Sequence, residues 1–163
     1  MNIFITGIAG MIGFHLSNEL HKKKYNVTGI DNFNDYYDVN LKKDRANILI
    51  EKNIKIYDSD IIELNNTEWK NYLNDVDLII HLAAYTNPRH SLTNQQLYID
   101  TNITGTNKLI NALEINNKNK VIYASSSCVM HGQTLPWNEN DSPMHQNNPY
   151  GWTKRVNECQ FIH

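Results

Sequence analysis

The chain has 163 residues, of which 40% are hydrophobic and 20% charged, a length and composition that suit one globular domain. Its formal net charge of -2 leaves no basic field for a nucleic acid, and two cysteines, Cys128 and Cys159, are too few for a disulfide framework and are not spaced as metal ligands. No apolar run reaches the roughly 20 residues of a membrane span, and no secretion signal opens the chain, so we expect a cytoplasmic protein with reduced thiols and no bound metal.

Short apolar runs alternate with helical patterns along the chain. The runs predict buried strands at residues 2–6, 26–30, 54–57, 78–82 and 121–124. Between them, apolar spacing predicts helices at 12–20, 39–51 and about 67–73, a long helix over 92–113, and a last helix from Tyr150 onward. Strands joined by helices indicate right-handed crossovers and a parallel sheet with helices on both faces. We therefore predict a doubly wound α/β (Rossmann) fold, with residues 1–163 as one domain and ligands beyond the carboxyl ends of the strands.

Three glycines follow the first strand directly. In the turn Thr6-Gly7-Ile8-Ala9-Gly10-Met11-Ile12-Gly13, Gly7 permits a tight turn, Gly10 lets a pyrophosphate approach the backbone, and Gly13 lets the helix pack close to the strand. The spacing is GxxGxxG, which differs from the commonest dinucleotide fingerprint, GxGxxG. A helix that begins here offers unpaired amides and a positive dipole end, so the turn predicts a dinucleotide site.

Asp31 ends the second strand, about 20 residues after the glycine turn, where a carboxylate accepts both ribose hydroxyls of a dinucleotide. A carboxylate there repels the extra phosphate of NADP, and no arginine adjoins it, so we expect NAD as the cofactor. The alternative is that Asp31 only starts the polar loop that follows. Asp60 and Ile61, just past the third strand, are candidates to bound the adenine, with an ordinary loop aspartate as the alternative.

Tyr150 and Lys154 lie four residues apart and therefore on one face of the last predicted helix. The strand before them ends in Ser125-Ser126-Ser127, which places hydroxyls at the carboxyl edge of the sheet, although serines there are often turn residues. With the positive nicotinamide, Lys154 would lower the pKa of Tyr150 until it serves as a base. Tyr150 would then take a proton from a sugar hydroxyl held by a serine while the carbon passes hydride to NAD.

These residues resemble the extended short-chain dehydrogenases/reductases, and within them the NAD-dependent nucleotide-sugar epimerases and dehydratases. The resemblance covers essentially the whole chain. It rests on the glycine turn, on the run Asp31-Asn32-Phe33-Asn34-Asp35-Tyr36-Tyr37, on His81-Leu82-Ala83-Ala84, on Arg89 and Ser91, on Asn102 with Gly105-Thr106-Asn107, and on Tyr150 with Lys154. The loop after Asp31, with Leu41-Lys42-Lys43 and Arg45, is similar to the UDP-glucuronate 4-epimerase branch.

The resemblance implies further roles around the cofactor and the substrate. It implies that Asn32 and Asp35 lie near the adenosine ribose, and that Leu82, Ala83 and Ala84 lie beside the phosphates and the nicotinamide ribose. The resemblance also implies that Asn102 contacts the cofactor. The alternative for both His81 and Asn102 is that each only forms hydrogen bonds that hold backbone segments together. Arg89, Ser91 and the strand-end serine are implied to approach a nucleotide sugar, either a UDP-hexose or a UDP-uronate.

The serine run leaves two readings of the catalytic serine. The family commonly has Val-Tyr-Gly after the serines, whereas this chain has Val129-Met130-His131-Gly132. Alignment from the strand selects Ser126, and alignment from Gly132 selects Ser127. Dehydratases and decarboxylases of the family usually carry an acidic residue just after this hydroxyl. Its absence here favours epimerisation at C4.

Family members are considerably longer than this chain. We therefore expect the N-terminal half of a nucleotide-sugar 4-epimerase, truncated before the substrate-binding domain and active only when a C-terminal half is supplied. The alternatives are a non-catalytic NAD-binding module, and a dehydratase or reductase of the same superfamily. The resemblance also implies a homodimer through the long helix and the helix of Tyr150, with pairing to a separate C-terminal half as the other possible assembly.

Overall fold

The computed structural model describes residues 1–115, 120–140 and 145–161. Contacts between residues divide the chain into two compact units, and each is described by itself. The first unit comprises Met1–Ala83 and Asn111–Tyr123, and the second comprises Ala84–Ile110 and Ala124–His163.

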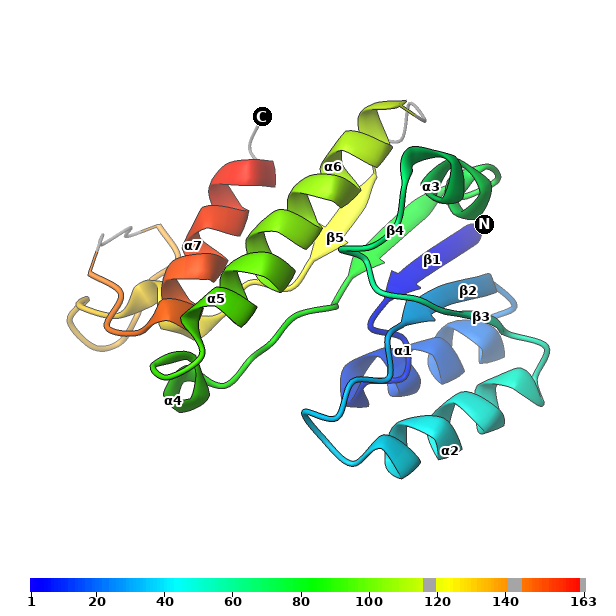
Figure 1. Cartoon of the computed structure of the whole chain (residues 1–163), viewed down its shortest axis with the longest axis horizontal. Coiled ribbons are helices and arrows are strands. Elements are labelled where there is room, and N and C mark those ends of the chain that lie inside the picture. Colours follow the sequence, from blue (N-terminus) through cyan, green and yellow to red (C-terminus); the bar gives the residue numbers. More distant parts are fainter. Residues whose placement is uncertain (116–119, 141–144, 162–163) are drawn as a thin grey trace. The chain divides into compact units, whose positions relative to one another are not determined.

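The first unit is built on a five-stranded parallel sheet (Figure 1). Its strands are β1 (Asn2–Thr6), β2 (Asn26–Asp31), β3 (Lys55–Asp58), β4 (Leu78–His81) and β5 (Val121–Tyr123), in the spatial order β3-β2-β1-β4-β5. Each strand limit lies within one residue of the predicted one. The chain moves outward from β1 to β3 and then returns to β4 on the other side of β1. The predicted doubly wound fold is therefore confirmed, and its switch point lies between β1 and β4.

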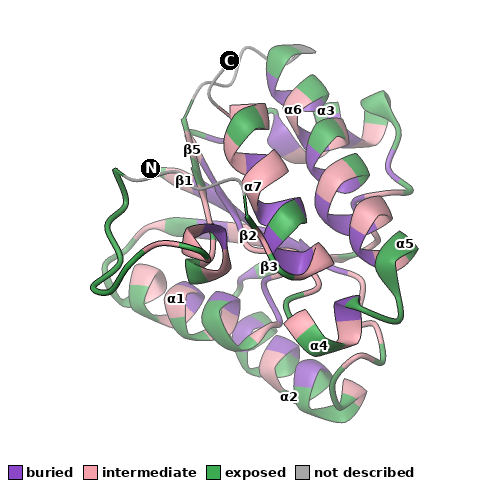
Figure 2. Ribbon diagram, turned by 90° about the vertical axis from the view of Figure 1, so that its left-hand side faces the viewer, coloured by how far each residue is buried: buried purple, intermediate pink, exposed green. Residues whose placement is uncertain are grey.

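One face of the sheet is covered by α1 (Met11–Lys22) and α2 (Val39–Ile50). Because side chains alternate along a strand, Ile3 and Ile5 of β1 both point to this face. They join a buried aliphatic core with Ile8, Val27, Leu49, Ile54 and Ile80. Figure 2 shows the outer sides of α1 and α2 exposed, as expected for helices that each bury one stripe.

The opposite face is aromatic and is covered by α3 (Asn66–Leu73). Phe4 lies between the two inward isoleucines of β1, so it points to this side, where its ring lies 6.4 Å from that of Trp69 and 6.3 Å from that of Tyr57. Tyr72 stacks on Tyr57 with ring centroids 3.9 Å apart. A capping box formed by Asn65 and Glu68 starts α3. Helices therefore cover both faces of the sheet, as predicted.

The helix ends in this unit are closed by matched turns. Lys24 after α1 has φ 65° and Asn53 after α2 has φ 61°. In each turn the next amide donates five residues back, from Tyr25 N to Leu20 O at 3.1 Å and from Ile54 N to Leu49 O at 3.1 Å. These are Schellman motifs, in which the left-handed residue ends the helix.

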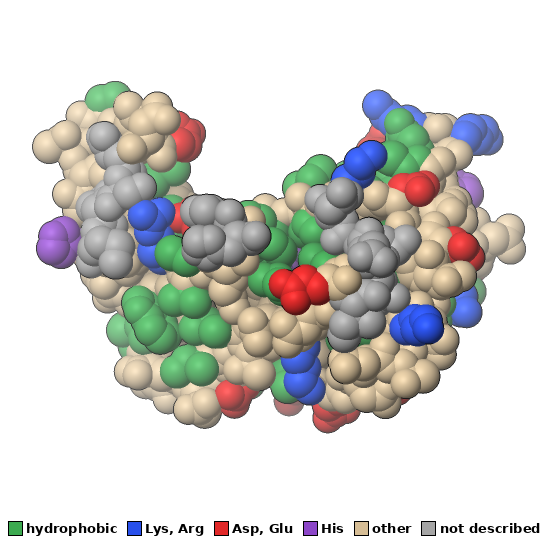
Figure 3. Space-filling view, turned by 90° about the horizontal axis from the view of Figure 1, so that it is seen from above, with side chains coloured by type: hydrophobic (Ala, Val, Ile, Leu, Met, Phe, Trp, Pro, Cys, Tyr) green, Lys and Arg blue, Asp and Glu red, His purple; other side chains and the backbone are tan. Residues whose placement is uncertain are grey.

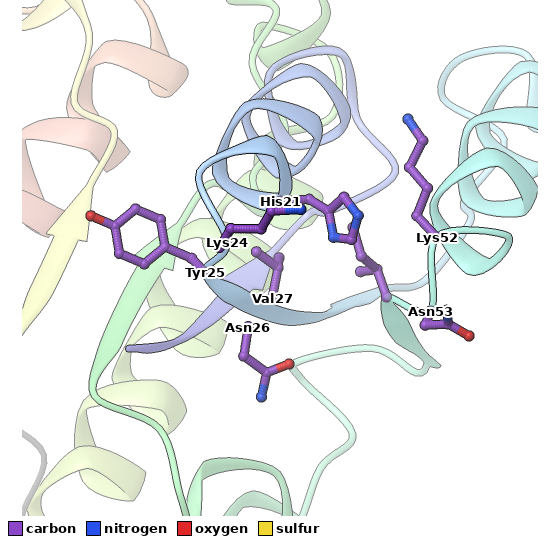
Figure 4. A pocket seen from close by; sticks show the side chains of 8 residues that line it. His21, Lys24, Tyr25, Asn26, Val27, Lys52 and Asn53 are labelled. Atoms are coloured by element: carbon purple, nitrogen blue, oxygen red, sulfur yellow. The ribbon is translucent and has the colours of Figure 1, made fainter.

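A pocket of about 360 Å³ lies between these two turns, at the edge where β2 begins (Figure 4). It is lined on one side by His21 and Lys24 and on the other by Lys52 and Asn53. Lys24 and Lys52 follow the C-terminal ends of α1 and α2, where the helix dipole favours positive charge. The pocket is at the edge opposite the carboxyl ends of the strands, so it is separate from the predicted dinucleotide site.

The second unit is helical. It contains α4 (Pro88–Ser91), α5 (Gln95–Tyr98), a π-helical segment (Ile99–Gly105), a short 3-10 helix (Ser127–Met130) and α7 (Pro149–Phe161). The π-helical segment runs into α6 (Thr106–Ile115), whose residues up to Ile110 belong to this unit and whose residues from Asn111 belong to the first. The prediction of one long helix from residue 92 was wrong at its start. Thr93 Oγ1 and Asn94 Nδ2 both donate to His90 O, at 3.3 Å and 3.1 Å, and these bonds separate α4 from α5.

Charged side chains are interspersed on the surface. Figure 3 shows Lys and Arg side chains among Asp and Glu on the face it presents. Among the described residues, no helix combines the length and the hydropathy needed to cross a bilayer. Within the same residues, no group of three or more histidine, cysteine, aspartate or glutamate side chains is placed to hold a metal ion.

Candidate active site

The glycine turn after β1 has no room for side chains at two of its three glycines. Gly7 has φ +71°, and a Cβ there would lie 2.9 Å from Ala83 N, at the end of β4. A Cβ at Gly13 would lie 2.3 Å from Gly7 O. These atoms are backbone and cannot move aside like a flexible side chain. Gly7 and Gly13 therefore hold β1, α1 and the end of β4 in close contact.

Gly10 has the space that Gly7 and Gly13 lack. A Cβ there would meet only Gly7 O at 3.1 Å, and its φ of -64° is ordinary for any residue. As the N-cap of α1 it has no side chain to accept a hydrogen bond. The first-turn amides of Met11, Ile12 and Gly13 have no acceptor within the helix. Since Met11 and Ile12 are exposed, this helix start can receive an anionic group from solvent.

Asp31 is held against the glycine turn. Its Oδ2 accepts from Ala9 N at 3.0 Å and its Oδ1 from Phe33 N at 3.0 Å. Burial raises the pKa of Asp31, and the hydrogen bonds from Phe33 and Ala9 and the charge of Lys42 partly offset this rise. The Asp31 carboxylate therefore both hydrogen-bonds within the loop that it starts and lies beside the glycine turn. A position at the start of the polar loop is thus compatible with a role at the ribose.

Lys42 is a member of this site that the sequence analysis did not assign. It is 7% exposed, and its Nζ donates to Asn34 O at 2.8 Å and to Asn34 Oδ1 at 2.7 Å. Burial lowers its pKa, while Asp31 and Asp35 raise it. Lys42 thus places one positive charge behind the loop that carries two carboxylates. The only signal in the sequence was a lysine in the helix that follows an acidic loop.

The loops after β2 and β3 meet through Asn32 and Asp60. Asn32 Nδ2 donates to Asp60 Oδ2 at 2.7 Å, and Asp60 Oδ1 accepts from Ile62 N at 2.9 Å. Ile61 is buried, and the predicted ribose residue Asp35 is exposed. The structure therefore brings Asn32 and Asp60 together, and leaves Asp35 accessible to solvent.

The end of β4 is tied to the end of β1 through Thr6. Its Oγ1 accepts from Leu82 N and Ala83 N, both at 3.1 Å, and lies 2.7 Å from His81 Nδ1. A hydroxyl can accept two hydrogen bonds and take part in a third through its own proton, so Thr6 Oγ1 can make all three of these contacts at once. His81 therefore ties the two strand ends together, and Leu82 and Ala83 lie directly beside the glycine turn.

In the second unit, Ser126 lies beside Tyr150. The Ser126 side chain opposes the rise in the pKa of the phenol, and Ser126 Oγ accepts from Cys128 N at 3.2 Å, which starts the 3-10 helix. Ser127, the other predicted serine, is exposed. Of the two, Ser126 is the one that influences the pKa of Tyr150.

Lys154 lies one turn after Tyr150 in α7 and is 4% exposed. Its Nζ donates to Ala124 O at 3.0 Å, and burial lowers its pKa to about 8. The pKa of Tyr150, predicted to be lowered, is instead raised. Burial of the phenol is the largest cause, Ser126 opposes it, and Cys128 adds to it. The prediction depended on the positive nicotinamide, so the protein alone does not produce the lowered pKa.

The remaining predicted residues lie in the second unit. Asn102, in the π-helical segment, accepts from Tyr85 N at 2.9 Å and donates to Tyr85 O and to Thr153 Oγ1, each at 3.0 Å. These hydrogen bonds join Asn102 to the backbone of Tyr85 and to α7, which agrees with the alternative interpretation that Asn102 has a structural role. Arg89 is exposed on α4, and Ala84 is half-buried. Ser91 is fully buried, with its hydroxyl bonded to backbone.

Comparison with protein families gives a match along almost the whole chain. Residues 3–161 match the NAD dependent epimerase/dehydratase family. A UDP-glucuronate 4-epimerase of Thermodesulfobacterium geofontis is 38% identical over 157 residues, which cover 93% of this chain and 47% of that relative. UDP-glucuronate 4-epimerase 1 of Arabidopsis thaliana is 35% identical, with 97% of this chain and 37% of the relative covered.

Solved structures show the same fold. The UDP-glucuronic acid 4-epimerase of Bacillus cereus, in complex with UDP-glucuronic acid and NAD, matches with a TM-score of 0.88 and 32% identity, covering 98% of this chain and 50% of that one. MoeE5 in complex with UDP-glucose and NAD matches with a TM-score of 0.83 and 28% identity, covering 99% and 48%. The chain spans about half the length of the relative from Thermodesulfobacterium geofontis and of both solved structures, and 37% of the relative from Arabidopsis thaliana.

Proposed function

Because this chain belongs to the NAD dependent epimerase/dehydratase family, we propose that it is the cofactor-binding and base-carrying half of a nucleotide-sugar 4-epimerase. The proposed substrate is a UDP-uronate of the UDP-glucuronate kind. Relatives with that activity, at 38% and 35% identity, support this choice. In this proposal the rest of the substrate site comes from a segment or a separate chain that corresponds to the other half of the relatives.

The residues of the first unit fit NAD. The amides of Met11, Ile12 and Gly13 would hold the pyrophosphate, and the backbone contacts of Gly7 and Gly13 keep this helix start in place. Asp31 would accept the ribose hydroxyls, with Asn32 beside it. Lys42 balances only part of the charge of Asp31 and Asp35, so the loop stays net negative and favours NAD over NADP. When bound, NAD supplies a hydride acceptor that later gives the hydride back.

The residues of the second unit would move the proton. Tyr150 would take the proton from the C4 hydroxyl as that carbon is oxidised to a ketone, and return it once hydride reaches the other face of C4. Ser126 would donate to the same oxygen. Lys154 holds a positive charge at neutral pH, since its pKa of about 8 lies above 7, and with the cofactor it would favour the phenolate.

One observation carries the proposal: Tyr150 and Lys154 are both buried one turn apart in α7, and Ser126, the first serine of the predicted pair, influences the pKa of the phenol. A tyrosine with a purely structural role would need neither Ser126 nor Lys154 beside it. Serine, phenol and ammonium together suit abstraction of a proton from a hydroxyl.

The test is to incubate the purified chain with UDP-glucuronate and NAD, alone and with the product of any adjacent reading frame, and to analyse the sugar nucleotides. Formation of the 4-epimer in either mixture is expected. Tyr150→Phe should abolish turnover and leave NAD affinity unchanged, because the phenol belongs to the proton step. Turnover that survives Tyr150→Phe would exclude Tyr150 as the base, and a 4-keto-6-deoxy product would assign a dehydratase.

A second function, a non-catalytic NAD-binding module, is favoured by one observation: the chain spans about half the length of its relatives. Measurable NAD binding with no 4-epimer in either mixture would select this function over the first.

A further inference from the structure

The N-terminus of α7 has a partner for every backbone amide of its first turn. Pro149 has no N–H. Gly151 N donates to Asn148 Oδ1 at 2.8 Å, and Trp152 N makes the first helical bond, to Asn148 O at 3.1 Å. The remaining amide, that of Tyr150 between Pro149 and Gly151, donates to Ser91 Oγ at 3.1 Å. A residue of α4, far away in the sequence, thus completes the cap of α7.

The Ser91 hydroxyl is fully committed to the protein. Ser91 is 0% exposed, its proton goes to Pro88 O at 2.6 Å, and it accepts the Tyr150 amide. A buried hydroxyl with both bonds inside the chain has little capacity for a ligand. Ser91 was expected at the substrate, and its position suits a different task.

The same part of the chain also contacts the ring of Tyr150. Tyr98 packs edge-on against Tyr150 with ring centroids 6.2 Å apart, and its hydroxyl donates at 2.8 Å to the carbonyl of Asn87, the residue that caps α4. The backbone of Tyr150 is therefore held by Ser91, and its ring by a tyrosine anchored to the start of α4.

We infer that Ser91 is a positioning residue for Tyr150: it fixes the first turn of α7, and with it the direction in which the phenol meets Ser126. The inference rests on the proposed role of Tyr150 for its catalytic meaning, but the contact itself does not. Without the Ser91 hydroxyl, the Tyr150 amide would be buried without an acceptor, and the turn would shift to find one. The position of the Tyr150 phenol relative to Ser126 would change, whereas the glycine turn in the first unit would keep its own contacts.

The experiment is an ultraviolet titration of tyrosinate in the purified chain with saturating NAD. Each variant is compared with the same variant carrying Tyr150→Phe, so that the difference reports the ionisation of Tyr150 alone. Ser91→Ala is expected to raise the pKa of Tyr150, because a shift of the first turn of α7 would move the phenol away from Ser126, which favours its ionised form. Ser91→Thr, which keeps the hydroxyl, should titrate as the unchanged chain does.

Ser17→Ala is the matched control. Ser17 is also 0% exposed and donates to a backbone carbonyl, Gly13 O, at 2.7 Å, but it lies in α1. It should cost a similar amount of stability without moving the titration of Tyr150. If Ser91→Ala does not fold, Ser91→Cys keeps nearly the same volume with a weaker acceptor and should shift the pKa in the same direction.

An unchanged titration in Ser91→Ala or Ser91→Cys, or an equal shift in Ser17→Ala, would overturn the inference. The titration needs no turnover, so a chain that forms no 4-epimer leaves this test intact. The two proposals can therefore fail separately.

Discussion

Replacing Gly13 by alanine sets two effects of opposite sign against each other. Alanine is better than glycine inside a helix by about 1 kcal/mol. The new Cβ, however, would lie 2.3 Å from Gly7 O and 2.8 Å from Ile8 Cα, and both are backbone atoms of the turn. Overpacking of this kind costs about 3 kcal/mol at the upper end of its usual range. We expect Gly13→Ala to destabilise the chain by about 2 kcal/mol, which lowers the melting temperature by roughly 4–8 °C.

The measurement is thermal unfolding followed by circular dichroism, with Gly10→Ala as the matched variant. Its Cβ would meet one backbone oxygen at 3.1 Å, so the melting temperature should fall far less. NAD affinity should nevertheless drop, because the methyl group occupies the approach of the pyrophosphate. A Gly13→Ala chain that melts at or above the temperature of the unchanged chain would show that the turn is not held by this close contact.

Lys154→Met should stabilise the chain at pH 7 by about 2 kcal/mol, since burial lowers the pKa of Lys154 from 10.5 to about 8 and the lost bond to Ala124 O offsets part of the gain. Between pH 8 and 10.5 Lys154 keeps its proton in the unfolded chain but loses it in the folded chain, so the stability of the unchanged chain rises with pH. The difference in urea midpoint between the unchanged chain and Lys154→Met should therefore shrink over this range, and a constant difference would contradict the prediction. Lys24→Gly should raise stability by about 1 kcal/mol, because Lys24 has φ 65°, and an unchanged urea midpoint would argue against strain there. Asp31→Asn should reduce the affinity for NAD about tenfold and reduce the preference for NAD over NADP, both measured by calorimetry. An affinity for NAD equal to that of the unchanged chain would show that Asp31 does not bind the ribose.

The sheet could be predicted from the sequence because its signal is local. Each strand is a short apolar run, and the glycines of the turn follow the first strand directly. Even so, Ile12, counted in the apolar stripe of α1, is 59% exposed, while Phe14 packs against the core. Ile12 lies in the first turn, beyond the edge of the sheet, where a helical stripe no longer faces strands.

The helical unit was harder to predict because its key contacts join residues far apart in the chain. Spacing gave one helix over 92–113, but side chains of Thr93 and Asn94 bond back to His90 and interrupt it. Ser91 looked like a ligand residue in sequence, since nothing local shows that its hydroxyl reaches the Tyr150 amide. Lys42 was missed for the same reason: its partner, Asn34, lies in a loop whose path the sequence does not reveal.

The position of β5 has a practical consequence for handling the chain in solution. In the described residues β5 is the last strand of its sheet and pairs only with β4, and Ile122 in its middle is 56% exposed. An outer strand with an exposed apolar side chain is a template for adding another strand. We expect the isolated chain to self-associate through this edge as its concentration rises, and a charged residue in place of Ile122 to keep it monodisperse.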